Sequence, residues 1–206
     1  MKTRNPTLIC LLLETVGIAA LFLPFVLDYS PWKVLAESVQ NRSLGADGAW
    51  PLALPAFLAI FVWLLTLRSL FHWPLRRAES WLHAGLAVPL MFVPLGFWLP
   101  LLEENANKWK LVLLAVLFFG LALSAAGLLL ILSRKGTAFG FLAPLALRCA
   151  YIPNAVFCLL FFSGWGHNWG DLRVGAACVG ATVVLYLAEI VYLTRQGLTA
   201  RPGTAQ

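Results

Sequence analysis

The chain consists mostly of long apolar stretches, separated by short segments that carry charges, glycine, proline or asparagine. Six of these stretches approach the roughly 20 apolar residues that a helix needs to cross the hydrocarbon of a bilayer. A helix is the expected form, because it satisfies its own backbone hydrogen bonds in lipid. The sequence therefore predicts an all-α integral membrane protein, a six-transmembrane-helix bundle forming one domain over residues 1–206. The predicted spans are residues 8–27, 50–67, 84–102, 111–132, 139–162 and 174–193.

A further short helix is predicted between the first two spans. Ser30 followed by Pro31 has the pattern of a helix N-cap and a proline at the first helical position. Trp32, Leu35 and Val39 then share one face at helical spacing. We expect this helix either to lie at the outer membrane interface or to cap the bundle from outside.

The distribution of basic residues predicts the orientation of the bundle. Cytoplasmic segments of membrane proteins are enriched in lysine and arginine. With the N-terminus in the cytoplasm, nine basic residues fall on the inner side and five on the outer side, and both termini are cytoplasmic. The inner set is Lys2, Arg4, Arg68, Arg76, Arg77, Arg134, Lys135, Arg195 and Arg201, and the outer set is Lys33, Arg42, Lys108, Lys110 and Arg173.

Composition agrees with a membrane location and excludes several functions. Apolar residues make up 61% of the 206 residues and charged residues 12%, whereas soluble domains have about half apolar and a quarter charged residues. No segment is left for a soluble ATP-hydrolysing or nucleic-acid-binding domain. The net charge of +6 is therefore interpreted as a topology signal. We expect the plasma membrane, best matched by a bacterial inner membrane, with the lipid bilayer as the main partner.

Three ionisable residues lie inside the predicted spans: Glu14, Arg148 and Glu189. A charge within hydrocarbon costs about 2.5–3.5 kcal/mol on insertion scales, so such residues are usually paired. At about 1.5 Å per residue, they lie roughly 9, 13 and 6 Å from the cytoplasmic ends of their spans. All three therefore fall in the inner half of the bilayer, and the long arginine side chain can reach either acid. We expect one cluster that joins the first, fifth and sixth spans.

Polar residues at helical spacing extend this cluster along the fifth and sixth spans. Residues three or four positions apart share one helix face, so both polar stripes are expected to face the bundle interior. Gly17 and Ala20 in the first span, and Ala176 and Gly180 in the last, predict close approach of these helices. The candidate ligand or ion cluster is Glu14, Arg148, Tyr151, Asn154, Thr182, Tyr186 and Glu189.

The cluster has two interpretations. In the first, it is a polar pocket or ion path that opens to the cytoplasm, with Arg148 binding an anionic group. In the second, it is a structural salt bridge that fixes helix packing, because two acids and one base can satisfy each other. Ionisable residues within a membrane are functional candidates by default, but the sequence does not choose between the two.

Histidine offers two weaker candidates. Ser163, His167 and Asp171 lie in a glycine- and tryptophan-rich outer segment, where a headgroup-contacting loop is favoured over a serine hydrolase. His72 and His83 flank a short basic inner loop, and neither lies deep on a helix as a haem ligand would. The cysteines are interpreted as small apolar residues. No catalytic residue, metal ligand or cofactor is predicted.

The favoured function is a small transporter or a membrane protein that binds a ligand or lipid through the polar cluster. The alternative is a non-catalytic subunit or scaffold of a larger membrane complex, with other membrane subunits or further copies of this chain as partners. The third is an intramembrane lipid-modifying enzyme in which Glu14 or Glu189 acts as a base. An enzyme is the least favoured of the three, and nucleic acid is not an expected partner.

Overall fold

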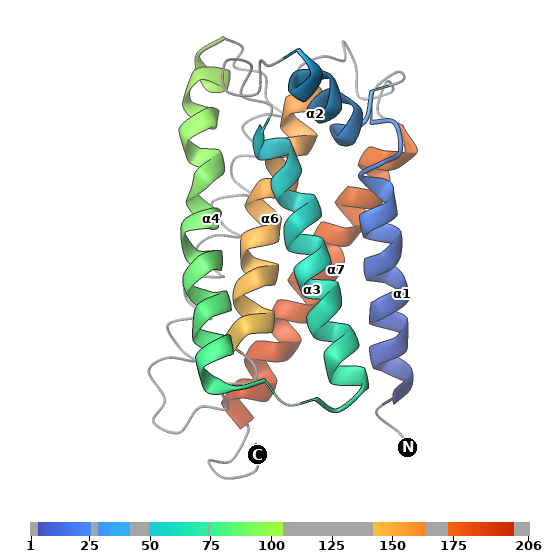
Figure 1. The fold of residues 1–206 in the computed structure, drawn as a ribbon, viewed down its shortest axis with the longest axis vertical. Coiled ribbons are helices and arrows are strands. Elements are labelled where there is room, and N and C mark those ends of the chain that lie inside the picture. Colours follow the sequence, from blue (N-terminus) through green and yellow to red (C-terminus); the bar gives the residue numbers. More distant parts are fainter. Residues whose placement is uncertain are drawn as a thin grey trace.

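The computed structural model describes residues 4–25, 29–41, 50–73, 75–104, 142–163 and 173–199. Its elements are α-helices and one short 3-10 helix, so the all-α prediction is confirmed for this part of the chain. Figure 1 shows the long helices side by side as a bundle. The elements are α1 (Arg4–Ala20), α2 (Pro31–Gln40), η1 (Trp50–Ala53), α3 (Leu54–Leu70), α4 (Arg77–Glu104), α6 (Leu142–Ser163) and α7 (Val174–Thr199).

Within the described residues, three helical segments are long and apolar enough to cross a membrane: Trp50–Leu70, Leu142–Phe162 and Val174–Arg195. They correspond to the spans predicted at 50–67, 139–162 and 174–193. Helix α4, with 28 residues, includes the predicted span 84–102. The predicted span 111–132 lies outside the described residues. A membrane protein is thus supported, whereas the count of six spans and the cytoplasmic termini remain predictions.

Helix α6 is the central element of the bundle. It packs against α3, α4, α7 and η1, while α1 packs against α3 and α7. Within its apolar segment 89% of residues are buried, against 44% and 39% for the segments of α3 and α7. The outer helices therefore expose apolar side chains that a bilayer would solvate. The first turn of α1 and the last turns of α7 lie at one end of the bundle, and α2 lies across the other (Figure 1).

Helix α1 is shorter than predicted. We expected the first span to continue to residue 27, but α1 ends at Ala20, so that boundary was wrong. Three successive i→i−3 hydrogen bonds tighten the chain over residues 21–23, and Pro24 disfavours helix at the residue before it. The carbonyls of Pro24 and Phe25 then accept hydrogen bonds from the N–H groups of Gly175 and Arg173 at 3.2 and 2.7 Å. The end of the first span is therefore fastened to the start of α7.

Helix α2 confirms the predicted cap. The Ser30 side chain accepts a hydrogen bond from the Lys33 N–H at 3.2 Å, and Pro31 opens the helix. Pro31 and Val34 are buried, whereas Trp32 and Val39 are each 53% exposed. The helix thus covers the end of the bundle with one side and presents the predicted apolar face outward.

Two glycines allow close helix contacts. A Cβ added at Gly17 of α1 would lie 2.6 Å from Thr182 Oγ1 of α7, and one at Gly175 would lie 2.7 Å from the Leu23 carbonyl oxygen. Only a hydrogen atom fits at such separations. The predicted close approach is therefore confirmed at Gly17. Gly180 differs, because a Cβ there meets nothing within 4 Å.

Candidate functional site

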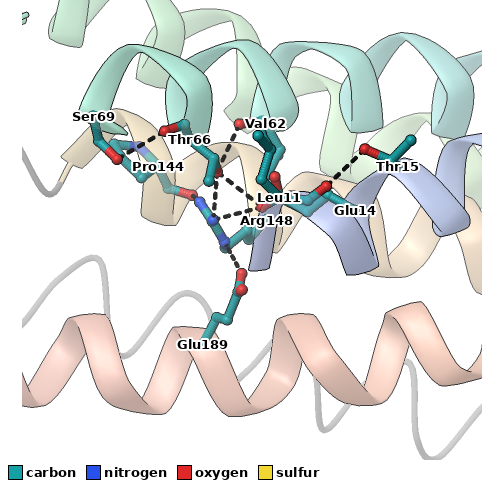
Figure 2. Close-up of polar contacts among 9 residues, drawn as sticks. All are labelled: Leu11, Glu14, Thr15, Val62, Thr66, Ser69, Pro144, Arg148 and Glu189. Carbon is teal, nitrogen blue, oxygen red and sulfur yellow. Dashed lines mark hydrogen bonds and ion pairs between the residues drawn. The ribbon is translucent and has the colours of Figure 1, made fainter. Parts of the chain in front are cut away.

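Arg148 is the centre of a buried polar cluster that joins four helices (Figure 2). It lies six residues after the start of α6 at Leu142, about 9 Å along the helix axis, and its residue is 6% exposed. Its Nη1 donates to the Pro144 carbonyl oxygen at 3.2 Å. Its Nη2 and Nε donate to side chains of other helices. The guanidinium is thus held by its own helix on one side and by α1, α3 and α7 on the others.

Glu14 has the least exposed side chain of the three charged residues. Its side chain is fully buried, and its Oε1 accepts hydrogen bonds from Arg148 Nη2 and from Thr66 Oγ1, both at 2.9 Å. Thr66 Oγ1 of α3 also accepts a hydrogen bond from Arg148 Nη2 at 3.3 Å. Its single hydroxyl proton is shared between Glu14 Oε1 and the Val62 carbonyl oxygen, which lies 3.1 Å away. The second oxygen of Glu14, Oε2, is buried and has no hydrogen-bond partner among the described residues.

Glu189 of α7 occupies the more open side of the cluster. Its Oε2 forms an ion pair with Arg148 Nε, and its side chain is 12% exposed. Its Oε1 is buried and, within the described part of the chain, accepts no hydrogen bond. The Cys10 thiol of α1 lies within interaction range of the same carboxyl group. Glu189 therefore lies between the buried arginine and the partly exposed edge of α1 and α7.

The cluster contains two carboxyl groups and one guanidinium. If all three were ionised, its net charge would be −1, in surroundings where an uncompensated charge is costly. Arg148 is already bound to both carboxylates, so an anionic ligand would have to displace one of them. The electrostatics of the cluster favour a positively charged ligand.

One tyrosine lies beside the guanidinium, and a second packs against that tyrosine. The Arg148 Cζ is 5.6 Å from the centroid of the Tyr186 ring, a distance at which a cation is attracted to the ring face. Tyr151 packs edge-on against Tyr186, with ring centroids 4.7 Å apart. Both rings are fully buried, and neither hydroxyl has a hydrogen-bond partner among the described residues. Tyr151 of α6 and Tyr186 of α7 are thus the polar residues that follow the charged cluster in the two predicted polar stripes.

Asn154 binds the backbone of α4 instead of the charged cluster. Its Nδ2 donates to the Leu90 carbonyl oxygen at 2.9 Å and to the Ala150 carbonyl oxygen at 2.8 Å. The Leu90 carbonyl has no α-helical donor of its own, because the residue four positions later is Pro94, which has no N–H. Asn154 therefore satisfies a carbonyl freed by a proline in the neighbouring helix, as membrane proteins commonly require.

The structure brings together part of the predicted site. Glu14, Arg148 and Glu189 meet as predicted, and Tyr186 lies next to them with Tyr151 packed against its ring. Two other candidates are turned to the backbone: Asn154 as described, and Thr182, whose hydroxyl donates to the Cys178 carbonyl oxygen at 2.9 Å. The sequence reasoning missed Thr66 and Cys10. Thr66 was identifiable as the polar residue at the inner end of an otherwise apolar span.

Of the histidine candidates, His72 and His83 lie within the described residues. His72 has a positive φ of 57° at the end of α3, and His83 Nδ1 lies 2.6 Å from the Glu79 carbonyl oxygen one turn earlier in α4. Most of the segment from Ser163 to Asp171 lies outside the described residues. No group of three or more histidine, cysteine, aspartate or glutamate side chains in the described part could hold a metal ion.

A second ion pair links α3 and α4 outside the predicted spans. Arg68 Nη2 lies 2.9 Å from Glu79 Oε2, and the same oxygen accepts the Arg76 N–H at 3.1 Å. The hydrogen bond from Arg76 and the charge of Arg68 lower the pKa of Glu79 below its usual value. This exposed pair offers a control for the buried one.

No protein-family model, curated protein or solved structure matches the chain.

Proposed function

We propose that this protein is a small membrane transporter whose ligand site is the cluster of Glu14, Arg148 and Glu189. The single observation that carries the proposal is the excess of carboxyl groups. Two buried carboxylates share one guanidinium, and each leaves one oxygen without a partner among the described residues. A positively charged ligand supplies both the missing charge and the missing hydrogen bonds.

The arrangement of the helices supports the same proposal. Arg148 and Thr66 lie toward the end of the bundle where α6 begins and α3 ends, and Glu14 lies ten residues after the start of α1. Its most open member, Glu189, belongs to α7, so a ligand would enter between α7 and α1. With the predicted orientation this entrance opens to the cytoplasm. The ligand class that fits two carboxylates and one aromatic ring is a small cation.

A structural salt bridge is the competing explanation. Replacing a complete buried ion pair with apolar residues of similar volume is often neutral or stabilising, whereas removing one partner is destabilising by about 3–5 kcal/mol. The triple variant Glu14→Leu, Arg148→Met and Glu189→Leu therefore tests the two roles separately. For a transporter, it folds but carries no ligand. For a structural bridge, it folds and any activity elsewhere in the protein is unchanged.

The test uses purified protein in liposomes, with uptake of radiolabelled methylammonium, guanidinium and sodium and flux of protons as four separate measurements. We expect at least one cation to be carried by the wild type, and that flux to fall to the protein-free background in Glu14→Gln and in Glu189→Gln. Glu79→Gln, in the exposed ion pair, is the matched control and keeps wild-type flux. Transport of small cations is rejected when wild-type liposomes carry none of the four, or when both glutamine variants carry them normally.

The exposed surface favours a second candidate, a non-catalytic subunit of a membrane complex. Large apolar side chains on α1, α3, α4 and α7 are exposed, including Leu12, Phe57, Leu82 and Val184 at 58–66%. Lipid or partner helices would cover them equally well. Purification in mild detergent, followed by identification of proteins that co-elute in constant proportion, tests this candidate. A monodisperse protein without constant co-eluting partners rejects it.

A further inference from the structure

The unpaired oxygens of the cluster point to the identity of one of its ligands. Glu14 and Glu189 each bind Arg148 through one oxygen, while Glu14 Oε2 and Glu189 Oε1 are buried and bind nothing in the described part of the chain. An unsatisfied carboxylate oxygen in a low-dielectric interior is costly. A proton on either carboxyl group removes the excess charge and converts an acceptor into a donor.

The charged and titratable groups that face the cluster are few. Among the described residues, Glu14 interacts with Arg148 of α6 and with Glu189 and Tyr186 of α7, while α3 contributes the Thr66 hydroxyl. The Cys10 thiol of α1 faces Glu189. Arg148 is the one positive charge in this set. The remaining charge of −1 must therefore be balanced by a group that comes from outside the set.

A proton fits this position better than a metal ion. Hard cations in proteins take about six or more oxygen ligands. Around Arg148, the buried oxygens without a hydrogen bond in the described part of the chain are one from each carboxyl group and one from Tyr186. A proton needs one oxygen, and the second carboxylate can then accept a hydrogen bond from it.

We propose that the cluster is a single-proton site, in which one proton held by the pair Glu14 and Glu189 brings the cluster with Arg148 to neutrality. Glu189, the more exposed acid, exchanges the proton with water, and Glu14 is the buried partner. This inference deepens the proposed function and rests on the same cluster. A cationic ligand would compete with the proton for one negative charge, so that transport exchanges a cation for a proton.

Infrared spectroscopy of the purified protein in nanodiscs tests the proton site directly. A protonated carboxyl group has its own carbonyl stretching band, which shifts in deuterated water. At neutral pH, where solvent-exposed glutamates are ionised, we expect this band from one carboxyl group in the wild type. Glu14→Gln and Glu189→Gln each remove it, because the remaining acid pairs one-to-one with Arg148. The exposed Glu79→Gln is the matched control and leaves the band unchanged.

Two results would overturn the proton site: no such band in the wild type at neutral pH, or a band that persists in both glutamine variants. If a glutamine variant does not fold, Glu14→Asp and Glu189→Asp serve instead, and each is expected to shift the pH midpoint of the band. Titration with methylammonium and guanidinium separates the two proposals. A band that is present but unaffected by either cation supports the proton site and counts against cation exchange.

Discussion

The contact between Gly17 and Thr182 gives a direct test of how closely α1 and α7 approach. In Gly17→Ala, the new Cβ would lie 2.6 Å from Thr182 Oγ1, 2.9 Å from its Cγ2 and 3.3 Å from its Cβ. Separations below 3.0 Å force a displacement. Thr182 cannot turn away without cost, because its hydroxyl donates to the Cys178 carbonyl oxygen. The helices must therefore separate or the threonine must give up that hydrogen bond.

Overpacking of this kind costs about 1–3 kcal/mol. Alanine also has a higher helix propensity than glycine, by about 1 kcal/mol, which offsets part of the loss. Gly180→Ala removes this complication, because a Cβ at Gly180 meets nothing within 4 Å and gains the same propensity. The difference between the two variants therefore isolates the steric cost. For a chain of 206 residues, each kcal/mol corresponds to about 2–4 °C in Tm, so Gly17→Ala should melt about 2–12 °C below Gly180→Ala.

Thermal unfolding in one detergent, followed by circular dichroism or intrinsic tryptophan fluorescence, measures the difference. A double-mutant cycle identifies its cause. Thr182→Ala deletes the two closest atoms, so Gly17→Ala should cost less in that background than in the wild type. Equal melting temperatures for Gly17→Ala and Gly180→Ala would refute the close contact. If Gly17→Ala lowers the stability as much in the Thr182→Ala background as in the wild type, the clash is not with Thr182.

Two further predictions concern Asn154 and Glu79. Asn154→Ala should lower the stability by about 1–3 kcal/mol, because it leaves the Leu90 carbonyl oxygen buried and unpaired. This loss should be smaller in a Pro94→Ala background, where residue 94 regains its N–H. Thermal unfolding of the wild type, the two single variants and the double variant measures both effects. Because the pKa of Glu79 is lowered in the folded protein, its contribution to stability is present above the ordinary carboxyl pKa and is lost as pH falls through the lowered value. Melting temperatures measured against pH should therefore fall less steeply with acid in Glu79→Gln than in the wild type.

The charged cluster could be predicted because its signal in the sequence is strong. A charge in an apolar span is rare, and the rise per residue of a helix is nearly constant. The depths of Glu14, Arg148 and Glu189 therefore follow from their positions within the apolar runs. Their meeting also follows from the length of the arginine side chain. Helix type and approximate boundaries followed from the lengths of the apolar runs, as α3, α6 and α7 illustrate.

Other features depend on contacts that no local pattern reveals. The end of α1 at Ala20 is set partly by the hydrogen bonds from the start of α7 to Pro24 and Phe25, which are distant in the sequence. Asn154 continues the three-residue spacing of Arg148 and Tyr151 but binds a carbonyl that a proline in α4 leaves free. A threonine in a helix usually bonds to its own backbone. Thr66 does so too, and its role beside Glu14 emerges only when α1 and α3 are packed.

The ratio of acids to bases bears on whether the cluster only fastens helices. Fastening requires one carboxylate for one guanidinium, and Glu189 alone would supply it between α6 and α7. Glu14 brings a second carboxylate to the same guanidinium from α1, with one oxygen buried and unpaired in the described part of the chain. Such an excess charge is a cost that apolar residues of similar volume avoid. A ligand that neutralises the excess negative charge removes this cost, and its binding is favoured for that reason. A proton or a small cation is such a ligand.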